Sequence, residues 1–189
     1  ENLSTELATP FGWDFEAVCA NQRATWNDLF SRVQVRSDDY LEKQRFYNNM
    51  YRALCSRNTW SDVNGEWVST DGRVRRVADP ANDVMLGCDA FWNTFWNLNP
   101  FWNLVTPEWS GRWVRSQLAM YDANGWLAKG PAGLNYVPVM VAEHEIPQIV
   151  SAWQMGIRDF DGRKALEAAV KIANEFLERK DLIVYMEGR

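Results

Sequence analysis

Aromatic rings and side-chain amides alternate along one stretch of the chain, residues 86–109, which reads LGCDAFWNTFWNLNPFWNLVTPEW. The stretch holds four of the eleven tryptophans, and Trp113 follows just beyond it. The amides between the rings belong to Asn93, Asn97, Asn99 and Asn103. Rings bind the C–H faces of a sugar, and amides exchange hydrogen bonds with its hydroxyls. A carbohydrate-binding surface is therefore one interpretation of this stretch.

The spacing of the same rings also fits a helix packed into a core. Phe91 and Phe95 are four residues apart, as are Trp92 and Trp96, so each pair would share one face of a helix. Aromatic pairs of this kind contribute much of the apolar area that cores bury. The residues alone leave both interpretations open.

A second group of chemically capable side chains lies in the sequence AEHEIP. His144 is the single histidine of the chain, and Glu143 and Glu145 flank it. A lone histidine on a helix is more often packed or hydrogen-bonded than catalytic. Neighbouring helix positions point in different directions, so at most one of the two glutamates is expected to face a given pocket.

The spacing of cysteines and acids does not fit a metal site. The three cysteines lie far apart and lack a CxxC pair. Asp62, Asp71 and Asp79 do not follow the alternating acids and terminal glutamate of an EF-hand loop, so we expect them in surface turns. No metal site is predicted within this chain.

Apolar periodicity predicts an all-α fold of about six helices. Two long helices are expected first, at about 14–33 and from a cap at Ser37 or Asp38 to about Arg57. The aromatic stretch is expected to be helical from about Asp89 and disturbed near Pro100. The remaining helices are predicted from the Thr106-Pro107-Glu108 start to about Tyr121, over about 139–156, and after Asp161.

One interval, about residues 58–85, lacks a helical period. Asn64-Gly65 and Asp71-Gly72 are typical turn dipeptides, and they separate short runs that suit strands. We therefore expect a small β-hairpin insertion there, and no other notable extended structure.

Composition excludes several classes of protein. A chain of 189 residues with 47% hydrophobic residues can build a real core. The net charge of −5, with basic residues scattered singly, does not suit nucleic acid. No apolar run is long enough to span a bilayer, so no membrane span is expected.

The chain resembles the catalytic domain of glycoside hydrolase family 92, which consists largely of calcium-dependent exo-acting α-mannosidases. Four segments carry the resemblance: FYNNMYRALCSRNTWSDVNGEW, FWNTFWNLNPFWNLVTPEW, NGWLAKGPAG and MVAEHEIPQIVSAWQMGIRDFD. They follow the family's order over nearly the whole chain. The resemblance implies that residues 1–189 are one partial segment of an (α/α) toroid, because a complete catalytic domain of this family is much longer.

The resemblance also implies a cofactor, partners and a location. Calcium is implied as the cofactor, with most of its ligands outside this chain. The implied partners are a mannose-containing glycan and the remainder of the catalytic domain or another chain. Secretion or a periplasmic location is implied as well, and the 189 residues alone are not expected to hydrolyse α-mannosides.

The departures from the family pattern concern carboxylates. Where the family usually has Trp-Asp-Thr, this chain has Trp92-Asn93-Thr94. The family's general acid is a glutamate in a Gly-x-Glu loop; anchoring on Gly133 puts Asn135 there, and alignment backward from His144 selects Tyr136. None of these residues can donate the proton of a carboxylic acid, so no catalytic residue is assured. Trp92, Asn93, Asn135, Tyr136 and His144 remain the candidate substrate-binding residues.

Three functional hypotheses follow, and whether the chain belongs to an active enzyme is left open. The first is a segment of an α-mannosidase-like glycoside hydrolase that acts on terminal mannose. The second is a catalytically impaired relative that binds sugar. The third is a helical structural or interaction protein with an aromatic core. Sugar binding separates the third from the others, and turnover separates the first from the second.

Overall fold

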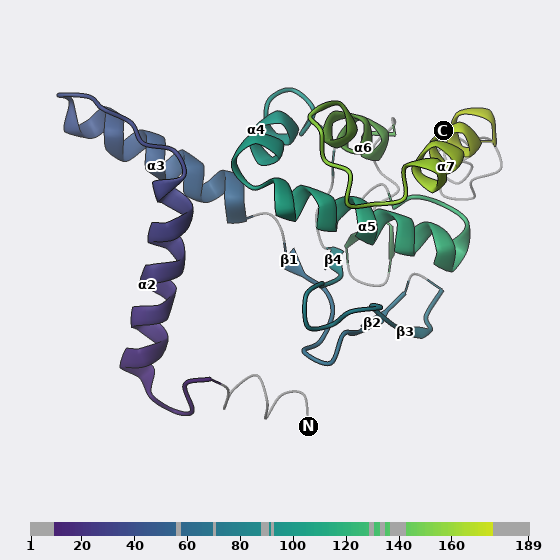
Figure 1. The fold of residues 1–189 in the computed structure, drawn as a ribbon, viewed down its shortest axis with the longest axis horizontal. Helices are drawn as coiled ribbons and strands as arrows, with labels where there is room; N and C mark the ends of the chain where they lie inside the picture. The colour runs from purple at the N-terminus through teal and green to yellow at the C-terminus, as the bar shows by residue number, and fades with distance from the viewer. Residues whose placement is uncertain are drawn as a thin grey trace, which may run out of the picture. The chain divides into compact units, whose positions relative to one another are not determined.

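The computed structural model describes residues 10–55, 58–69, 71–87, 91, 93–128, 131–132, 135–136 and 143–175. These ranges contain six helices and six short strands, and the helices account for most of the described residues (Figure 1). The prediction of a mainly helical chain is confirmed. The chain divides into two compact units, Glu1–Ser56 and Arg57–Arg189, which are taken separately below.

The first unit contains the two predicted N-terminal helices, α2 (Phe15–Ser31) and α3 (Tyr40–Cys55). Aromatic side chains join them: the rings of Trp26 and Tyr51 have centroids 4.5 Å apart. The hydroxyl of Tyr47 on α3 also donates a hydrogen bond to the carbonyl of Val33, 3.1 Å away.

Aspartates cap both of these helices. Asp14 accepts a hydrogen bond from the N–H of Ala17, as expected for the predicted start of α2. At α3 the capping oxygen belongs to Asp39, which accepts from the N–H of Leu41 at 2.7 Å. The expected caps, Ser37 and Asp38, are therefore wrong by one or two positions. Ser37 instead accepts from the N–H of Asp39, which fixes the turn before the helix.

The second unit begins with the predicted hairpin region. Strands β2 (Glu66–Val68) and β3 (Val74–Arg76) pair antiparallel, and β1 (Asn58–Thr59) pairs antiparallel with β4 (Leu86–Gly87). Gly65 and Gly72 both have positive φ, which glycine adopts without strain. At Gly65 space is limiting as well, because a Cβ there would lie 2.6 Å from Pro80.

Helix α5 (Pro107–Asn124) is the centre of the second unit. It lies between the strands β1–β4 on one side and three helices on the other, α4 (Leu98–Val105), α6 (Glu145–Gln154) and α7 (Gly162–Glu175) (Figure 1). Pro107 begins α5, as predicted, because its missing N–H would have no intrahelical partner there. The helix ends at Gly125, which has φ of 83° and donates to the carbonyl of Tyr121.

Apolar side chains of α5, α6 and α7, and of the segments that follow α5 and α6, form the largest buried cluster among the described residues of this unit. Its members are Val114, Leu118, Leu127, Ile149, Ala152, Ile157, Ala165, Ala168 and Ile172. The predicted start of α7 is confirmed, since Asp161 accepts from the N–H groups of Arg163 and Lys164, each at 3.0 Å. Helix α6 is shorter than the predicted 139–156, and residues 139–142 of that range lie outside the described residues.

Two smaller findings complete the fold. A two-residue ladder, β5 (Pro131–Ala132) with β6 (Asn135–Tyr136), lies outside the interval in which extended structure was expected. Among the described residues, no helix has the combination of length and apolar character that a membrane crossing requires.

Candidate functional site

The aromatic stretch is predicted to be helical from about Asp89 and disturbed near Pro100, but its described residues become helical only later. Residues 93–97 form turns, and α4 starts only at Leu98. Pro100 therefore lies in the first turn of α4, where its missing N–H costs nothing. A helix continuing from Asp89 would have needed an N–H at Pro100 to bond the carbonyl of Trp96, so the predicted start was wrong for residues 93–97.

Backbone hydrogen bonds hold the 93–97 turn in place. Asn93 has φ of 65°, a left-handed conformation that asparagine tolerates better than most residues. The N–H of Trp96 donates to the carbonyl of Asn93 at 3.3 Å, and the N–H of Asn99 donates to the carbonyl of Thr94 at 2.8 Å. The Thr94 hydroxyl donates to the carbonyl of Phe91 at 2.9 Å. The turn is thus tied to the residues before it and to the start of α4.

Two rings of the turn are exposed and stack with His144. Phe95 is 38% exposed and Trp96 is 73% exposed. The Phe95 ring stacks on Trp96, with centroids 5.1 Å apart and planes at 25°, and on the half-buried imidazole of His144, at 5.6 Å and 11°. This contact brings the segment with Asn93, which is itself exposed, beside the start of α6.

Other rings of the same stretch are buried in the core. Phe91 is almost fully buried and meets the ring of Trp113 edge to face, with centroids 5.0 Å apart. Trp102 on α4 is buried as well. The two interpretations of the stretch therefore hold for different residues: some rings build the core, and Phe95 and Trp96 lie at the surface.

The structure says less about three of the candidate substrate-binding residues. Trp92 lies outside the described residues. Asn135 and Tyr136 form β6, with Ala132 opposite Asn135 and Pro131 opposite Tyr136. Proximity of the 130–136 loop to Trp92 and Asn93 remains a prediction.

Of the two glutamates that flank His144, Glu145 is fully buried and Glu143 is half-buried. Glu145 is the first residue of α6, where the helix dipole favours a negative charge. This difference in burial agrees with the expectation that the two glutamate side chains point in different directions. The sequence places both glutamates beside His144 but does not show which of them is buried.

The sequence analysis did not single out the amide of Asn99, which the structure shows to be buried. Its side chain is 1% exposed, and neither its amide nitrogen nor its amide oxygen has a hydrogen-bond partner among the residues that the structure describes. Buried polar atoms in this condition are rare and call for an explanation. The regular recurrence of asparagines in the stretch was the available signal.

A second missed feature is an ionic network in a polar cavity of about 620 Å³, between the hairpin, α5 and the start of α7. Arg115 donates two hydrogen bonds to the carboxylate of Asp83, at 2.7 and 3.0 Å, and two to Asp159, at 2.6 Å to its carboxylate and at 3.0 Å to its carbonyl. The bonds to Asp83, and then those to Asp159, raise the pKa of Arg115 against the opposing effect of desolvation. Arg112 also lies 3.9 Å from the carboxylate of Asp83, so two arginines face two aspartates. With its charges balanced in this way, the network is a structural link rather than a binding site.

The described residues do not supply an acidic metal site. No group of three or more histidine, cysteine, aspartate or glutamate side chains comes together in this part of the chain in a way that could hold an ion. Calcium prefers six to eight oxygen ligands, usually including carboxylates. The described residues therefore do not fit a calcium ion, and we assign calcium no chemical step here.

Solved structures share this fold. The α-mannosidase BT3965 of Bacteroides thetaiotaomicron superposes with a TM-score of 0.74 at 22% identity, over 82% of this chain and 20% of that protein. Its complex with mannoimidazole gives 0.72 at 22% identity, over 79% and 19%. The inverting mannosidase BT2199 of Bacteroides thetaiotaomicron VPI-5482 gives 0.75 at 25% identity, over 89% and 22%. The class of the fold is thus that of family 92 mannosidases.

The sequence comparison agrees with the fold. The model of the glycosyl hydrolase family 92 catalytic domain matches residues 1–188. This chain belongs to glycoside hydrolase family 92 and is a mannosidase-like segment of its catalytic domain. No curated protein matches the sequence. The chain spans about a fifth of the length of the solved proteins that it resembles.

Proposed function

We propose that the protein is an α-mannosidase-like glycoside hydrolase acting on terminal mannose of glycans, with this chain as part of its catalytic domain. The family match over residues 1–188 carries the proposal. Two similar structures support it, because one protein is described as an inverting mannosidase and the other was solved with mannoimidazole. Both descriptions concern those proteins, and their substrate class comes to this chain as our inference.

We place the sugar beside the 93–97 turn, with Trp92, Asn93, Asn135, Tyr136 and His144 as the contacting residues. The stacking of Phe95 on His144 supports this assignment, since it joins the turn that carries Asn93 to the start of α6. Asn93 is exposed and held in a left-handed conformation, so its amide is available to a ligand without rearrangement of the turn. The places of Trp92, Asn135 and Tyr136 in the site rest on the family resemblance.

A second candidate function is sugar binding with impaired hydrolysis. An inverting glycosidase needs one carboxylic acid to protonate the leaving oxygen and one carboxylate to activate water. Asn93 and Asn135 stand where the family usually has acids, and an amide forms hydrogen bonds but cannot supply that proton. A leaving group that is stable as an anion, such as a phosphate, would need less protonation.

The complete protein, supplied with calcium and an aryl α-mannoside, tests the proposal. Turnover supports the hydrolase, and mannoside binding without turnover supports the second candidate. If the amides limit catalysis, Asn93→Asp combined with Asn135→Glu should raise the rate. Asn174→Asp is the control, because Asn174 is an exposed amide on α7, outside the proposed site. Neither binding nor turnover of any mannoside by the intact protein would reject both candidates.

Calcium enters the proposal only as a cofactor held elsewhere. The described residues lack a suitable acidic cluster, so its ligands would come from other parts of the catalytic domain. Bound there, a divalent cation would orient sugar hydroxyls and neutralise charge. Calcium titration of the complete protein, followed by thermal unfolding, should raise the melting temperature if the ion binds.

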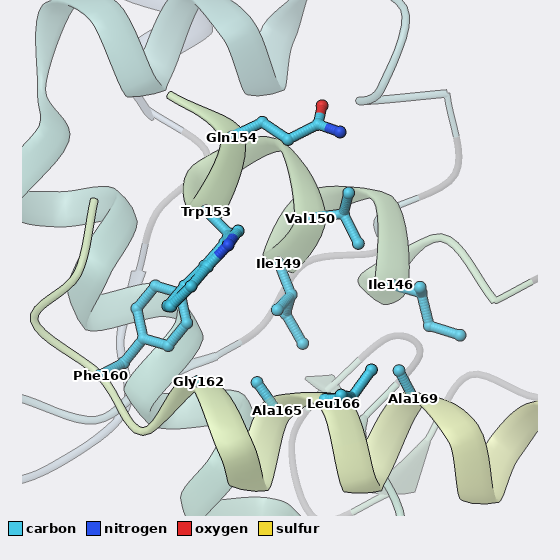
Figure 2. A pocket seen from close by; sticks show the side chains of 10 residues that line it. All are labelled: Ile146, Ile149, Val150, Trp153, Gln154, Phe160, Gly162, Ala165, Leu166 and Ala169. Carbon is cyan, nitrogen blue, oxygen red and sulfur yellow. The ribbon is translucent and has the colours of Figure 1, made fainter. Parts of the chain in front are cut away.

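The remainder of the catalytic domain is the partner that we propose for an apolar groove between α6 and α7. The groove has a volume of about 300 Å³ (Figure 2). Figure 2 shows Ile146, Ile149 and Trp153 of α6 above Ala165 and Ala169 of α7. Its lining is apolar except for the amide of Gln154 and the indole N–H of Trp153, which are fewer polar groups than a sugar requires. Leu166 lines the groove and is 66% exposed, and the match of this chain covers only 20% of the length of BT3965 and 22% of that of BT2199.

Leu166→Glu in the complete protein tests this docking surface. A charge in a covered apolar groove should lower the melting temperature by several degrees. Ala173→Glu is the control, because Ala173 is exposed on the same helix and does not line the groove. Equal small effects of the two variants would contradict the proposal. A change only in the oligomeric state after Leu166→Glu would point to a second copy of the chain and would likewise contradict it.

A secreted or periplasmic location is proposed from the resemblance. Glycans that carry terminal mannose are encountered mainly outside the cytoplasm, which agrees with this proposal. Cell fractionation followed by immunodetection tests it, and recovery of the protein in the cytoplasmic fraction would oppose it.

A further inference from the structure

The ring of Trp96 is the largest apolar group that the described part of the aromatic stretch leaves in solvent. It is 73% exposed. Phe91 and Trp102 of the same stretch are buried, and so is Trp113 just beyond it. An isolated exposed leucine or valine requires no explanation, but an indole is larger and is usually covered at least on one side. Trp96 stacks on Phe95, and one stacked neighbour cannot cover both faces of an indole.

The support beneath Trp96 is ordered before any ligand arrives. Phe95 lies nearly parallel both to Trp96 and to His144, at 25° and 11°. The turn is fixed by the hydrogen bonds from Trp96 N–H to Asn93 and from Asn99 N–H to Thr94. A ring held in this way loses little conformational freedom when it binds, so more of the contact energy appears as affinity.

Polar groups suited to hydroxyls lie on either side of the ring in sequence. Asn93 and Asn97 are both exposed, and the turn bond between residues 93 and 96 keeps Asn93 on the same turn as Trp96. An uncharged amide both donates and accepts hydrogen bonds, which matches a neutral sugar better than an anion or a cation. The combination is an aromatic face with amides at its border.

We propose that Trp96 forms a platform for the second sugar of a mannose-terminated glycan, the sugar adjacent to the terminal mannose. The proposal rests on the proposed function, which places terminal mannose beside Asn93. The apolar C–H face of the second sugar lies on the indole, and its hydroxyls exchange hydrogen bonds with Asn93 or Asn97. Trp96 thus selects for the length of the glycan and not for the terminal residue.

Calorimetry on the complete protein tests the platform with two ligands, methyl α-mannoside and an α-linked mannobiose. Trp96→Ala should weaken binding of mannobiose about tenfold, since an aromatic contact is worth roughly 1 kcal/mol or more. Binding of methyl α-mannoside should change less than twofold. Trp96→Phe keeps a ring and should retain most of the affinity for mannobiose. Trp13→Ala is the control, because Trp13 is exposed to a similar degree in the first unit and should leave both affinities unchanged.

The outcomes separate the platform from the proposed function. If the unmodified protein binds neither ligand, the proposed function is wrong and the platform falls with it. If it binds both ligands and Trp96→Ala leaves mannobiose binding intact, or weakens both ligands equally, the platform alone is wrong. A circular dichroism spectrum identical to that of the unmodified protein confirms that Trp96→Ala is folded. If that variant does not fold, the comparison is made with Trp96→Gln, and the same two results decide.

Discussion

The rings of one continuous stretch divide into two regions with opposite surroundings. Phe91 and Trp102 lie in the core, where Phe91 contacts Trp113, while Phe95 and Trp96 lie at the surface on the 93–97 turn. Composition is the same in both regions, since each combines rings with asparagines. The difference arises because the turn before α4 rotates the chain out of the helical repeat. Ring-rich sequence thus serves stability in one region and is free for recognition in the other.

The two regions also differ in how their polar groups are satisfied. In the buried region, Asn103 donates to the Ser151 hydroxyl at 2.8 Å and so links α4 to α6, whereas the side chain of Asn99 meets no hydrogen-bond partner in the described part of the chain. In the exposed region, water can serve Asn93 and Asn97. The sugar that we propose at the turn would therefore replace water, while any change to Asn99 acts on the core. Mutations in the two regions should separate stability from binding.

The largest expected effect is at Trp113, which is completely buried. Trp113→Ala should lower the free energy of unfolding by about 3–5 kcal/mol, because it removes a large ring and leaves a cavity beside Phe91. Trp96→Ala should change it by no more than about 0.5 kcal/mol, as for other surface substitutions. Urea unfolding of both variants measures the contrast. Similar losses of stability for Trp113→Ala and Trp96→Ala would contradict the division into a buried and an exposed region.

A smaller loss of stability is expected when Arg115, at the edge of the buried region, is replaced. Arg115→Met should destabilise the protein by about 1–3 kcal/mol, since charged hydrogen bonds to Asp83 and Asp159 are removed and Asp83 loses its main counter-charge. Arg163→Met, at an exposed position on α7, is the control and should be nearly neutral. Unfolding in urea measures both. An Arg115→Met variant as stable as its control would show that the network contributes nothing.

Asn99→Leu should act in the opposite direction. Leucine has the same number and branching of side-chain heavy atoms as asparagine, and it removes two buried polar atoms that lack partners among the described residues, so the free energy of unfolding should rise by about 1–2 kcal/mol. Thermal unfolding measures the change, and Asn97→Leu provides an exposed comparison with a change near zero. A clear loss of stability in Asn99→Leu would mean that the amide of Asn99 is held by hydrogen bonds after all.

The smallest effect concerns the hairpin, where the charges face solvent. Desolvation alone would raise the pKa of Asp71, but hydrogen bonds from the N–H of Arg73 and the guanidinium of Arg75 outweigh it, and the pKa is lowered. The folded state therefore favours the ionised carboxylate. The resulting stabilisation is present above the unfolded pKa of about 4 and is lost as the pH falls through the lower, folded value.

Asp71→Asn tests this pH dependence. The variant should be slightly less stable than the unmodified protein at pH 7, and the difference should shrink below about pH 4. Chemical unfolding at both pH values gives the comparison. A difference that grows on acidification would reverse the assigned direction of the shift.

The sequence by itself determined the features that depend on near neighbours. Asp14 and Asp161 cap the helices predicted to follow them, Pro107 begins α5, and the glycine turns of the hairpin lie where expected. Each of these signals acts within a few residues, through a capping bond, a fixed φ or a left-handed turn. The motifs of the chain also carried the family, which the comparison over residues 1–188 confirms.

Only the tertiary structure decided which chemically capable side chains are accessible. The period of the rings at 91–102 fits one helix, but packing of Phe91 on Trp113 and of Phe95 on His144 requires a turn before Leu98. The burial of Glu145, and not of Glu143, depends likewise on how α6 meets segments distant in sequence. Such contacts join residues that are 20 to 50 positions apart, and a local pattern contains no information about which face of an element a distant partner will cover.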